Sequence, residues 1–381
     1  MGHSFSHNRV EIDLAAIERN LNQVRSCGPT ALRVMAVVKA DAYGHGMLPV
    51  SRKLAQLGCE YLAVFRLEEA VRLREGGIDL PVVVLMGFLE DEREYGVECG
   101  VIPVLHDVRE IPELDAIARR KDRVVHVHLK IDTGMGRMGL PEHQAELALD
   151  LLRSCGGLKL DGLLTHLSAA EDPREEAYTL EQVKKFRQFL DLAHKMGHRP
   201  ANNQVSNSAA CIYRWNTGSD LVRTGLALYG TTPSPELGRR IALKPVMSFH
   251  SNVVQVKQAP AGTSISYGRT FITDRPTTLA AVPVGYADGY VRRFSNRSEV
   301  LIRGQRAPVR GRVCMNVTVV DVTSIQGVRE GDPVVLLGRQ GDEIITAEEL
   351  ANHADTISYE IFTAIGGQNP RIYIDSAPSI K

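Results

Sequence analysis

The stretch Val34-Met35-Ala36-Val37-Val38-Lys39-Ala40-Asp41-Ala42-Tyr43-Gly44-His45-Gly46 joins an apolar run to a polar turn that contains glycine. The apolar run is the first of eight short segments that alternate with segments of helical periodicity. Strands that alternate with helices predict a parallel sheet, and about eight such units favour a (β/α)8 TIM barrel of the α/β class. A doubly wound sheet is the alternative, but no GxGxxG motif follows the first strand. The predicted strands are residues 33–39, 61–65, 82–86, 102–105, 124–132, 160–166, 203–206 and 221–228.

The chain is longer than such a barrel requires. A barrel needs about 250 residues, whereas the chain has 381. From residue 247 onward, runs typical of β-strands are separated by turns, and only residues 346–353 have a helical pattern there. We therefore predict a barrel over residues 1–240 and a mostly-β domain over residues 241–381. Residues 9–14 alternate polar and apolar side chains as a half-buried strand does, and this strand is compatible with either domain.

Composition argues against several classes of protein. The 45 basic and 45 acidic residues give a net charge of zero, so we expect no nucleic-acid partner. No apolar stretch reaches the ~20 residues of a membrane-spanning helix, and the first residues lack the apolar core of a signal peptide. The six cysteines form no CxxC pair and no metal-type spacing with histidine, so we expect reduced thiols, no metal and a cytoplasmic protein.

Lys39 ends the first predicted strand, where burial should lower the pKa of its amine toward neutrality. A neutral amine on a rigid strand is what Schiff-base chemistry with a carbonyl cofactor requires. The alternative is a lysine whose amine extends into water. Because barrel active sites lie at the carboxyl ends of the strands, other residues at strand ends are candidates as well. They are Lys130, Asp132 and Arg137 near the fifth strand, His166 at the sixth, Asn207 and Ser208 at the seventh, and Arg223 and Gly225 at the eighth.

Two of these positions indicate a phosphate-bearing cofactor. Ser208 offers a hydroxyl and Gly225 a bare backbone near the last two strands, where barrels often bind phosphate through N–H groups. Arg223 lies inside an apolar strand, and an unpaired buried charge is very unfavourable. Two interpretations stay open for Arg223: a structural ion pair, with Asp220 or another acidic residue, or a donor to a ring nitrogen of the cofactor.

Other candidates carry less information on their own. Lys130 and Arg137 suit an anion, such as a substrate carboxylate or a phenolate oxygen. In the β domain, Tyr267 and Tyr286 lie beside glycines in predicted turns, and a tyrosine acts as a base only when nearby cations pull its pKa well below ~10. Met315 would ordinarily be packing at a strand edge.

Taken together, these motifs resemble the alanine racemases, a family of pyridoxal-phosphate enzymes built from a barrel and a β domain. The resemblance covers nearly the whole chain and rests on five stretches. They are residues 36–46, Lys130-Ile131-Asp132-Thr133-Gly134-Met135-Gly136-Arg137, Arg223-Thr224-Gly225, Ser266-Tyr267-Gly268 and Gly285-Tyr286-Ala287-Asp288-Gly289.

The resemblance implies racemisation of L-alanine and D-alanine, with D-alanine supplied for the peptidoglycan of the cell wall. It implies that Lys39 binds pyridoxal 5'-phosphate covalently and acts as one catalytic base. Tyr267 of the partner subunit in a homodimer would be the second base. Lys130 would be carbamylated and would orient Arg137, which with Met315 would contact the substrate. The implied cofactor-binding residues are Lys39, Tyr43, Leu85, Arg137, His166, Asn207, Ser208, Arg223, Gly225, Leu226 and Tyr359.

Two residues depart from the family pattern. Ser206 stands where the family usually carries alanine, a small change beside the expected phosphate site. Asn316 stands where many relatives have aspartate, which alters the expected charge near Tyr267 and Arg137.

Other functions share part of this pattern. A racemase of broader range would act on serine or basic amino acids with the same motifs. A barrel amino-acid decarboxylase shares the cofactor and a similar domain plan, but its chemistry favours an acidic residue at the position of Arg223. A protein that only carries the cofactor would not need a second base such as Tyr267.

Overall fold

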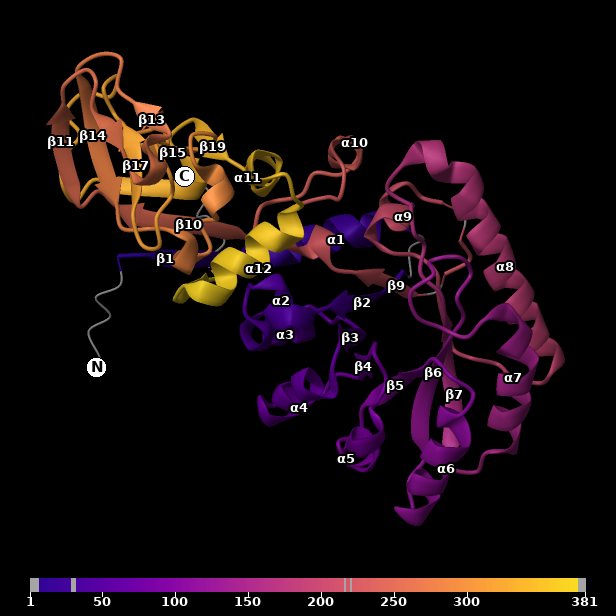
Figure 1. The fold of residues 1–381 in the computed structure, drawn as a ribbon. Coiled ribbons are helices and arrows are strands. Elements are labelled where there is room, and N and C mark those ends of the chain that lie inside the picture. Colours follow the sequence, from indigo (N-terminus) through magenta and orange to yellow (C-terminus); the bar gives the residue numbers. More distant parts are fainter. Residues whose placement is uncertain (1–6, 29–31, 216, 220, 376–381) are drawn as a thin grey trace.

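The computed structural model describes residues 7–28, 32–215, 217–219 and 221–375. Eight parallel strands form a nearly closed barrel, and a mostly-β domain follows it in the chain (Figure 1). The order of the barrel strands is β8-β7-β6-β5-β4-β3-β2-β9. They are β2 (Arg33–Val37), β3 (Tyr61–Val64), β4 (Val82–Val84), β5 (Ile102–Leu105), β6 (Val125–Lys130), β7 (Leu158–Leu164), β8 (Asn202–Gln204) and β9 (Leu221–Thr224).

All eight predicted barrel strands are present, and the predicted fold class is confirmed. The last prediction, residues 221–228, is wrong in its second half. The chain leaves the strand at Gly225, and residues Leu226–Tyr229 form the short helix η4. This turn places the Tyr229 hydroxyl where it donates to the carbonyl of Val37, at 2.9 Å. The apolar pattern of this segment therefore reports burial rather than an extended conformation.

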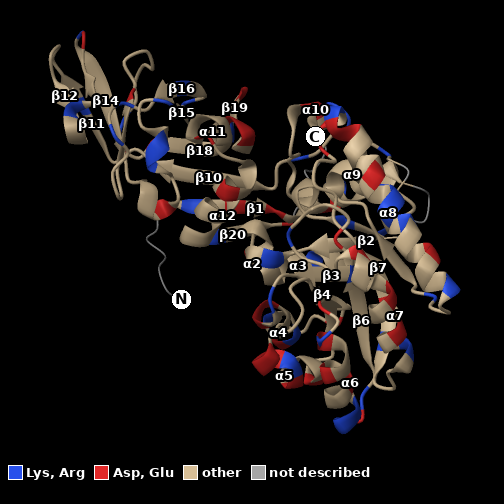
Figure 2. Cartoon of the chain, turned by 45° about the vertical axis from the view of Figure 1, so that its right-hand side comes forward, with Lys and Arg blue, Asp and Glu red and all other residues tan. Residues whose placement is uncertain are grey.

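The helices around the barrel follow their strands. Acidic and basic residues occur along outer helices such as α5, α6 and α8 (Figure 2), whereas the buried residues of α6 and α8 are mainly apolar. None of the helices in the described part of the chain is both long enough and apolar enough to cross a membrane. The helices are α1 (Leu14–Cys27), α2 (Lys39–Tyr43), α3 (Met47–Gln56), α4 (Leu67–Glu75), η1 (Glu90–Glu92), α5 (Arg93–Glu98), α6 (Glu110–Arg120), η2 (Glu142–Gln144), α7 (Ala145–Ser154), η3 (Pro173–Glu175), α8 (Glu176–Lys195), α9 (Ser208–Ile212) and α10 (Pro235–Gly238).

The β domain contains a seven-stranded sheet, a three-stranded sheet and a two-stranded hairpin. The large sheet has the order β16-β15-β18-β10-β1-β20, with β19 paired to β18; the smaller ones are β11-β14-β17 and β12-β13. The first strand of the chain, β1 (Arg9–Asp13), belongs to the large sheet, antiparallel to β10 and parallel to β20. The remaining strands are β10 (Met247–Asn252), β11 (Gln255–Ala259), β12 (Ser264–Ile265), β13 (Phe271–Ile272), β14 (Thr277–Val282), β15 (Glu299–Ile302), β16 (Gln305–Pro308), β17 (Thr318–Asp321), β18 (Pro333–Gln340), β19 (Glu343–Ile345) and β20 (Arg371–Ile374).

The β domain has a second long helix that the sequence pattern did not reveal. Besides α11 (Ala347–Ala354), residues Ser358–Gln368 form α12. Two adjacent glycines and two isoleucines make this segment unlike a typical helix sequence. Tertiary packing decides its conformation, because α12 lies against the barrel at α2 (Figure 1). The short helices η5 (Tyr267–Arg269), η6 (Tyr286–Asp288) and η7 (Arg292–Phe294) complete the domain.

The contact between α12 and α2 is close enough to require glycine. A Cβ atom on Gly366 would lie 2.0 Å from the carbonyl oxygen of Gly44, and one on Gly44 would lie 2.4 Å from that of Phe362. The two domains also share one continuous hydrophobic core. The β domain is therefore fixed against the carboxyl-terminal end of β2, where Lys39 lies.

Candidate active site

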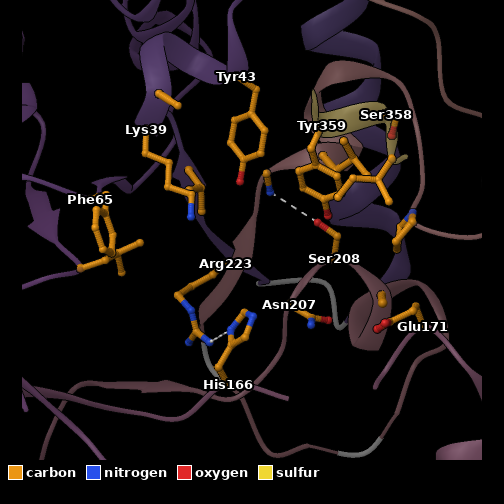
Figure 3. A pocket seen from close by; sticks show the side chains of 18 of the residues that line it. Lys39, Tyr43, Phe65, His166, Glu171, Asn207, Ser208, Arg223, Ser358 and Tyr359 are labelled. Atoms are coloured by element: carbon orange, nitrogen blue, oxygen red, sulfur yellow. Dashed lines mark hydrogen bonds between the residues drawn. The ribbon is translucent and has the colours of Figure 1, made fainter. Parts of the chain in front are cut away.

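A cavity of about 1490 Å³ opens at the carboxyl-terminal ends of the barrel strands. Its walls come mainly from the barrel, and α11 and α12 of the β domain contribute one side. The side chains of Lys39, Tyr43, Arg223 and Tyr359 point into this space (Figure 3). Of the predicted site residues, Lys39, Tyr43, Leu85, Lys130, Arg137, His166, Asn207, Ser208, Arg223, Gly225, Leu226 and Tyr359 line it.

The chain after Lys39 turns in an unusual way. Residues 40–43 have φ angles of 51°, 54°, 56° and 55°, a run of left-handed conformation without glycine. Each such residue costs about 1–2 kcal/mol relative to a right-handed turn. The Asp41 carboxylate offsets part of this cost, because it accepts hydrogen bonds from the Met47 backbone at 2.7 Å and from Arg371 of β20 at 2.5 Å. The turn therefore depends on contacts from the β domain.

The Lys39 amine lies in a partly desolvated, cationic environment. Its Nζ atom is 5.7 Å from the centre of the Phe65 ring. Burial lowers the pKa of Lys39, the charge of Arg137 lowers it further, and Glu69 opposes both effects. A lowered pKa increases the fraction of neutral amine, which is the nucleophilic form.

Arg223 is buried at the floor of the cavity without a carboxylate within ion-pair distance among the described residues. Its guanidinium donates to the carbonyls of Gln204 at 2.6 Å and Thr165 at 2.5 Å, and to Nδ1 of His166 at 3.2 Å (Figure 3). Burial lowers the pKa of Arg223 to about 10, and Arg137 adds to this effect. Asp220, the carboxylate considered as its partner, lies outside the described residues.

His166 is an acceptor for Arg223. Burial, followed by the charge of Arg223, lowers the pKa of His166 well below its ordinary value. The imidazole is therefore neutral near pH 7, and its Nδ1 atom accepts the guanidinium hydrogen bond.

Lys130 and Arg137 approach the cavity from the end of β6. Burial lowers the pKa of Lys130 to about 8, with further lowering by Arg223 and Arg137. Asp132 does not neutralise them fully, because it accepts hydrogen bonds from the backbone of Gly134 at 3.0 Å and Met135 at 2.8 Å. With Lys39 and Arg223, these two residues make a cluster of four basic side chains, which favours bound anions.

The opposite end of the cavity is suited to a phosphate group. The short helices α9 and η4 begin there, with Ser208 and Leu226 as their first residues. The Ser208 hydroxyl lies 3.1 Å from that of Thr224 and 3.4 Å from the backbone nitrogen of Gly225. A Cβ atom on residue 225 would lie 2.5 Å from the Tyr43 hydroxyl, so only glycine leaves this space open.

Two tyrosines, Tyr43 and Tyr359, lie beside this end of the cavity. The ring centres of Tyr43 and Tyr359 are 5.7 Å apart. Burial raises the pKa of Tyr359 to about 12, with a further contribution from Glu171, and burial also raises that of Tyr43. Both phenols therefore keep their protons and can donate hydrogen bonds to an anion.

Tyr267 and Met315 do not line this cavity. Their exposed fractions are 73% and 56%. Tyr267 begins η5, and Met315 lies in the segment that precedes β17. The Ser266 hydroxyl donates to the Arg312 carbonyl at 2.6 Å, and the backbone of residues 286 and 287 donates to the carbonyls of residues 314 and 315. Within one chain, Tyr267 therefore does not enter the cavity that contains Lys39, the other candidate base.

The sequence prediction missed two acidic residues at the site. Glu69 accepts hydrogen bonds from the backbone nitrogens of Ala40 at 2.6 Å and Phe65 at 2.8 Å, so it ties the start of the left-handed turn to the end of β3. Its place in the first turn of α4 was a visible signal, because acidic side chains there often bind free backbone N–H groups. Glu171 lines the cavity near Tyr359 and had no such signal.

Comparison with known protein families gives two matches that together span most of the chain. The family model "Alanine racemase, N-terminal domain" matches residues 12–233, and "Alanine racemase, C-terminal domain" matches residues 246–373. Among curated proteins, the alanine racemase of Halothermothrix orenii is 44% identical over 363 residues, which are 95% of this chain and 96% of the relative. The alanine racemase of Syntrophobacter fumaroxidans is 43% identical over 361 residues, which are 95% of this chain and 96% of the relative.

Solved structures agree with these matches. The alanine racemase of Streptomyces lavendulae has a TM-score of 0.92 and 35% identity, covering 98% of this chain and 99% of its own. That of Bacillus anthracis with bound L-Ala-P has a TM-score of 0.90 and 34% identity, covering 98% and 96%. That of Bartonella henselae, with covalently bound pyridoxal phosphate, has a TM-score of 0.85 and 28% identity, covering 97% and 100%.

Proposed function

The chain belongs to the alanine racemase family of pyridoxal-phosphate-dependent isomerases, and we propose that it interconverts L-alanine and D-alanine by a two-base mechanism. The observation that carries the proposal is the cluster of four basic side chains that includes Lys39. It lies in the same cavity as the recess at Ser208 and Gly225, which is suited to a phosphate group. A carboxylate substrate and a phosphorylated cofactor are both anions, so this arrangement suits both.

The described residues fit pyridoxal 5'-phosphate. Lys39 would bind it covalently, because its lowered pKa favours the neutral amine. Gly225 leaves open the space that a phosphate needs, and the first residues of α9 and η4 would offer backbone N–H groups to it. The remaining ligands we propose are Tyr43, Leu85, Arg137, His166, Asn207, Ser208, Arg223, Leu226 and Tyr359, all of which line the cavity.

Arg223 supports racemisation over decarboxylation. A guanidinium donates hydrogen bonds and accepts none, so a ring nitrogen that it faces must act as an acceptor and remain unprotonated. His166 also presents an acceptor, rather than a proton, to the guanidinium. We infer that this arrangement shortens the lifetime of negative charge on the substrate carbon and so suppresses transamination.

When bound, the cofactor acidifies the α-proton of the amino acid attached to it. Lys39 Nζ would remove or return this proton on one face of the α-carbon. Inversion of the α-carbon requires that a proton be delivered to the opposite face, and we propose that the phenol of Tyr267 delivers or removes it there. Arg137 and Met315 would contact the substrate, with Arg137 neutralising its carboxylate.

We propose that Tyr267 and Met315 reach the site of a partner subunit in a homodimer. They are exposed residues of the β domain, as are Ile272, Tyr286 and Val317, whose exposed fractions are 48%, 43% and 38%. Large apolar side chains that are exposed in a single chain are typical of a protein–protein interface. A symmetric dimer would use the same face twice and complete two sites.

We propose that Lys130 forms a carbamate. The neutral amine would form an N–C bond with carbon dioxide and release one proton to water, and a pKa of about 8 provides the neutral amine near neutral pH. Conversion of this cation into an anion would replace its repulsion from Arg223 and Arg137 with attraction. The anion would then orient Arg137 toward the substrate.

We propose that the enzyme is cytoplasmic and supplies D-alanine for peptidoglycan.

The racemase activity is tested by incubating the purified protein with L-alanine and a panel of other L-amino acids while following optical rotation and carbon dioxide. Racemisation of alanine without carbon dioxide is expected, and release of carbon dioxide would contradict the proposal. A Lys39→Ala variant should lose the visible absorbance of the bound cofactor.

A further inference from the structure

A line of polar side chains runs through the barrel interior beneath Arg223. His128 on β6 and Gln204 on β8 are fully buried, and their side chains meet, with Nε2 of Gln204 at 3.0 Å from Nδ1 of His128. Asp161 on β7 faces the other ring nitrogen of His128, at 3.5 Å. Asn202 supports Asp161 by donating to its carboxylate at 2.9 Å. Three neighbouring strands therefore contribute to one polar group inside an apolar barrel.

The backbone is shaped to hold the His128 ring. The pairing of β6 with β7 shifts register between Val127 and His128. The neighbouring residue on β7 is Gly162, where a Cβ atom would lie 2.7 Å from Cδ2 of the ring. Any other residue at position 162 would displace the imidazole, so this position leaves space for the ring.

The contacts of His128 determine where its proton lies. The Gln204 amide donates to Nδ1, so the proton of the neutral ring is on Nε2, which faces Asp161. Burial lowers the pKa of His128, although the Asp161 carboxylate opposes this, and Arg223 and His126 lower it further. A neutral imidazole with a defined tautomer is a rigid acceptor for Gln204.

Gln204 connects this group to the active site. Its backbone carbonyl accepts from Nη1 of Arg223 at 2.6 Å and also from the backbone nitrogen of Thr165 at 3.2 Å. Because Arg223 is held by carbonyls and one imidazole, the direction of its guanidinium depends on where these acceptors lie. A shift of Gln204 would therefore rotate the guanidinium.

We propose that His128 is a positioning residue for Arg223: with Asp161, it holds Gln204 so that the guanidinium faces the ring nitrogen of the cofactor. The assignment of the ring nitrogen rests on the proposed function, whereas the link from His128 to Arg223 does not. His128 touches neither cofactor nor substrate in this account. It acts through Gln204 and the backbone of β8.

Three variants separate positioning from simple space filling. His128→Leu fills much of the volume but has no acceptor for Gln204. His128→Asn keeps an acceptor near the place of Nδ1, so it should restore what the leucine variant loses. His198→Gln is the control, because His198 binds the Leu149 carbonyl at 2.9 Å near the barrel surface, away from Arg223.

The first measurement uses the protein without cofactor. In ¹⁵N-histidine spectra, His166 reports on Arg223, because its Nδ1 accepts from the guanidinium. We expect the His166 signals to move in His128→Leu and to stay at their wild-type positions in His128→Asn and His198→Gln. Unchanged His166 signals in a folded His128→Leu protein would overturn the proposal.

The second measurement uses the holoenzyme. We expect His128→Leu to lower kcat for alanine racemisation by about 10-fold or more with a much smaller change in KM, because misplacement of a fixed group by ~1 Å has effects of this order. The ratio of transamination to racemisation should rise in the same variant. The double variant His128→Leu/Gln204→Met should be no slower than the slower single variant, because both changes break one connection. Multiplied losses would contradict the connection.

The outcomes also separate this proposal from the proposed function. A wild-type protein that does not racemise alanine would contradict the proposed function, while the spectra would still test the link to Arg223. A wild-type racemase whose His128→Leu variant has normal kcat would contradict only the positioning role. If His128→Leu does not fold, Gln204→Met removes the same amide from the other side and should move the His166 signals equally; unchanged signals would again overturn the proposal.

Discussion

Substitution of Gly366 by alanine tests how tightly the β domain is held against the Lys39 turn. Gly366 is buried in α12, and a Cβ atom there would lie 2.0 Å from the carbonyl oxygen of Gly44 and 2.6 Å from its carbonyl carbon. The neighbouring Gly367 is in the same helix and has nothing within 4 Å of its Cβ position. The pair Gly366→Ala and Gly367→Ala therefore makes the same chemical change in two environments.

The two substitutions should change the free energy of unfolding in opposite directions. Alanine is favoured over glycine inside a helix by about 1 kcal/mol, so Gly367→Ala should raise the free energy of unfolding by up to that amount. Gly366→Ala has the same gain but adds an overpacking penalty, which is typically about 1–3 kcal/mol. We expect the upper part of this range or beyond, because the obstructing atoms are backbone and cannot rotate away. The net effect of Gly366→Ala should be a destabilisation of about 1–2 kcal/mol.

Urea denaturation of both variants measures these changes directly. Cofactor titration adds a second readout, because α12 carries Tyr359 into the cavity. Gly366→Ala should weaken cofactor binding, whereas Gly367→Ala should leave it unchanged. A Gly366→Ala protein as stable as the wild type would refute the close packing of α12 on α2.

Three further predictions follow from the geometry of the site. Occupancy of the Lys130 carbamate should rise with pH through about 8, because the neutral amine is the reactive form and its pKa is lowered to that value; ¹³C NMR under labelled carbon dioxide measures it, and onset only above pH 10 would contradict the burial argument. Ser208→Ala should weaken cofactor binding by about 10- to 150-fold, the effect of losing one hydrogen bond to a charged group, which fluorescence titration measures; unchanged affinity would place the phosphate elsewhere. Arg223→Glu should increase the conversion of bound cofactor to its amine form during turnover, which absorbance spectra follow; an unchanged rate of transamination would refute the proposed role of Arg223.

The sequence was sufficient to predict the barrel and most of the residues around its mouth. The carboxyl ends of parallel strands meet at one edge, so Lys39, Lys130, His166 and Arg223 could be placed together from strand order alone. The roles assigned to them required the family resemblance as well. Nothing in the strand pattern indicates a carbamate on Lys130.

Other features depended on contacts that a local pattern does not contain. Residues 40–43 have no composition typical of left-handed conformation, and their φ angles are maintained by Glu69, Arg371 and α12. The polar group at His128 depends on Gly162 and Gln204, which lie on neighbouring strands. Tyr267 could be recognised as a candidate base, but one chain does not bring it into the cavity that contains Lys39.

The central claim is that a lysine of one subunit and a tyrosine of the other act on the same α-carbon. Subunit complementation tests it most directly. Lys39→Ala and Tyr267→Phe proteins, each inactive or nearly so, are unfolded together, refolded as a mixture and assayed for alanine racemisation. A mixed dimer would contain one site with both residues and one with neither.

Random mixing should produce mixed dimers as half of the total, and each would have one of its two sites intact. We therefore expect recovery of about one quarter of the wild-type activity. Recovery should be absent when either variant is refolded alone. If the mixture stays as inactive as the separate variants although mixed dimers form, the two residues do not meet across a subunit interface, and the two-base proposal is contradicted.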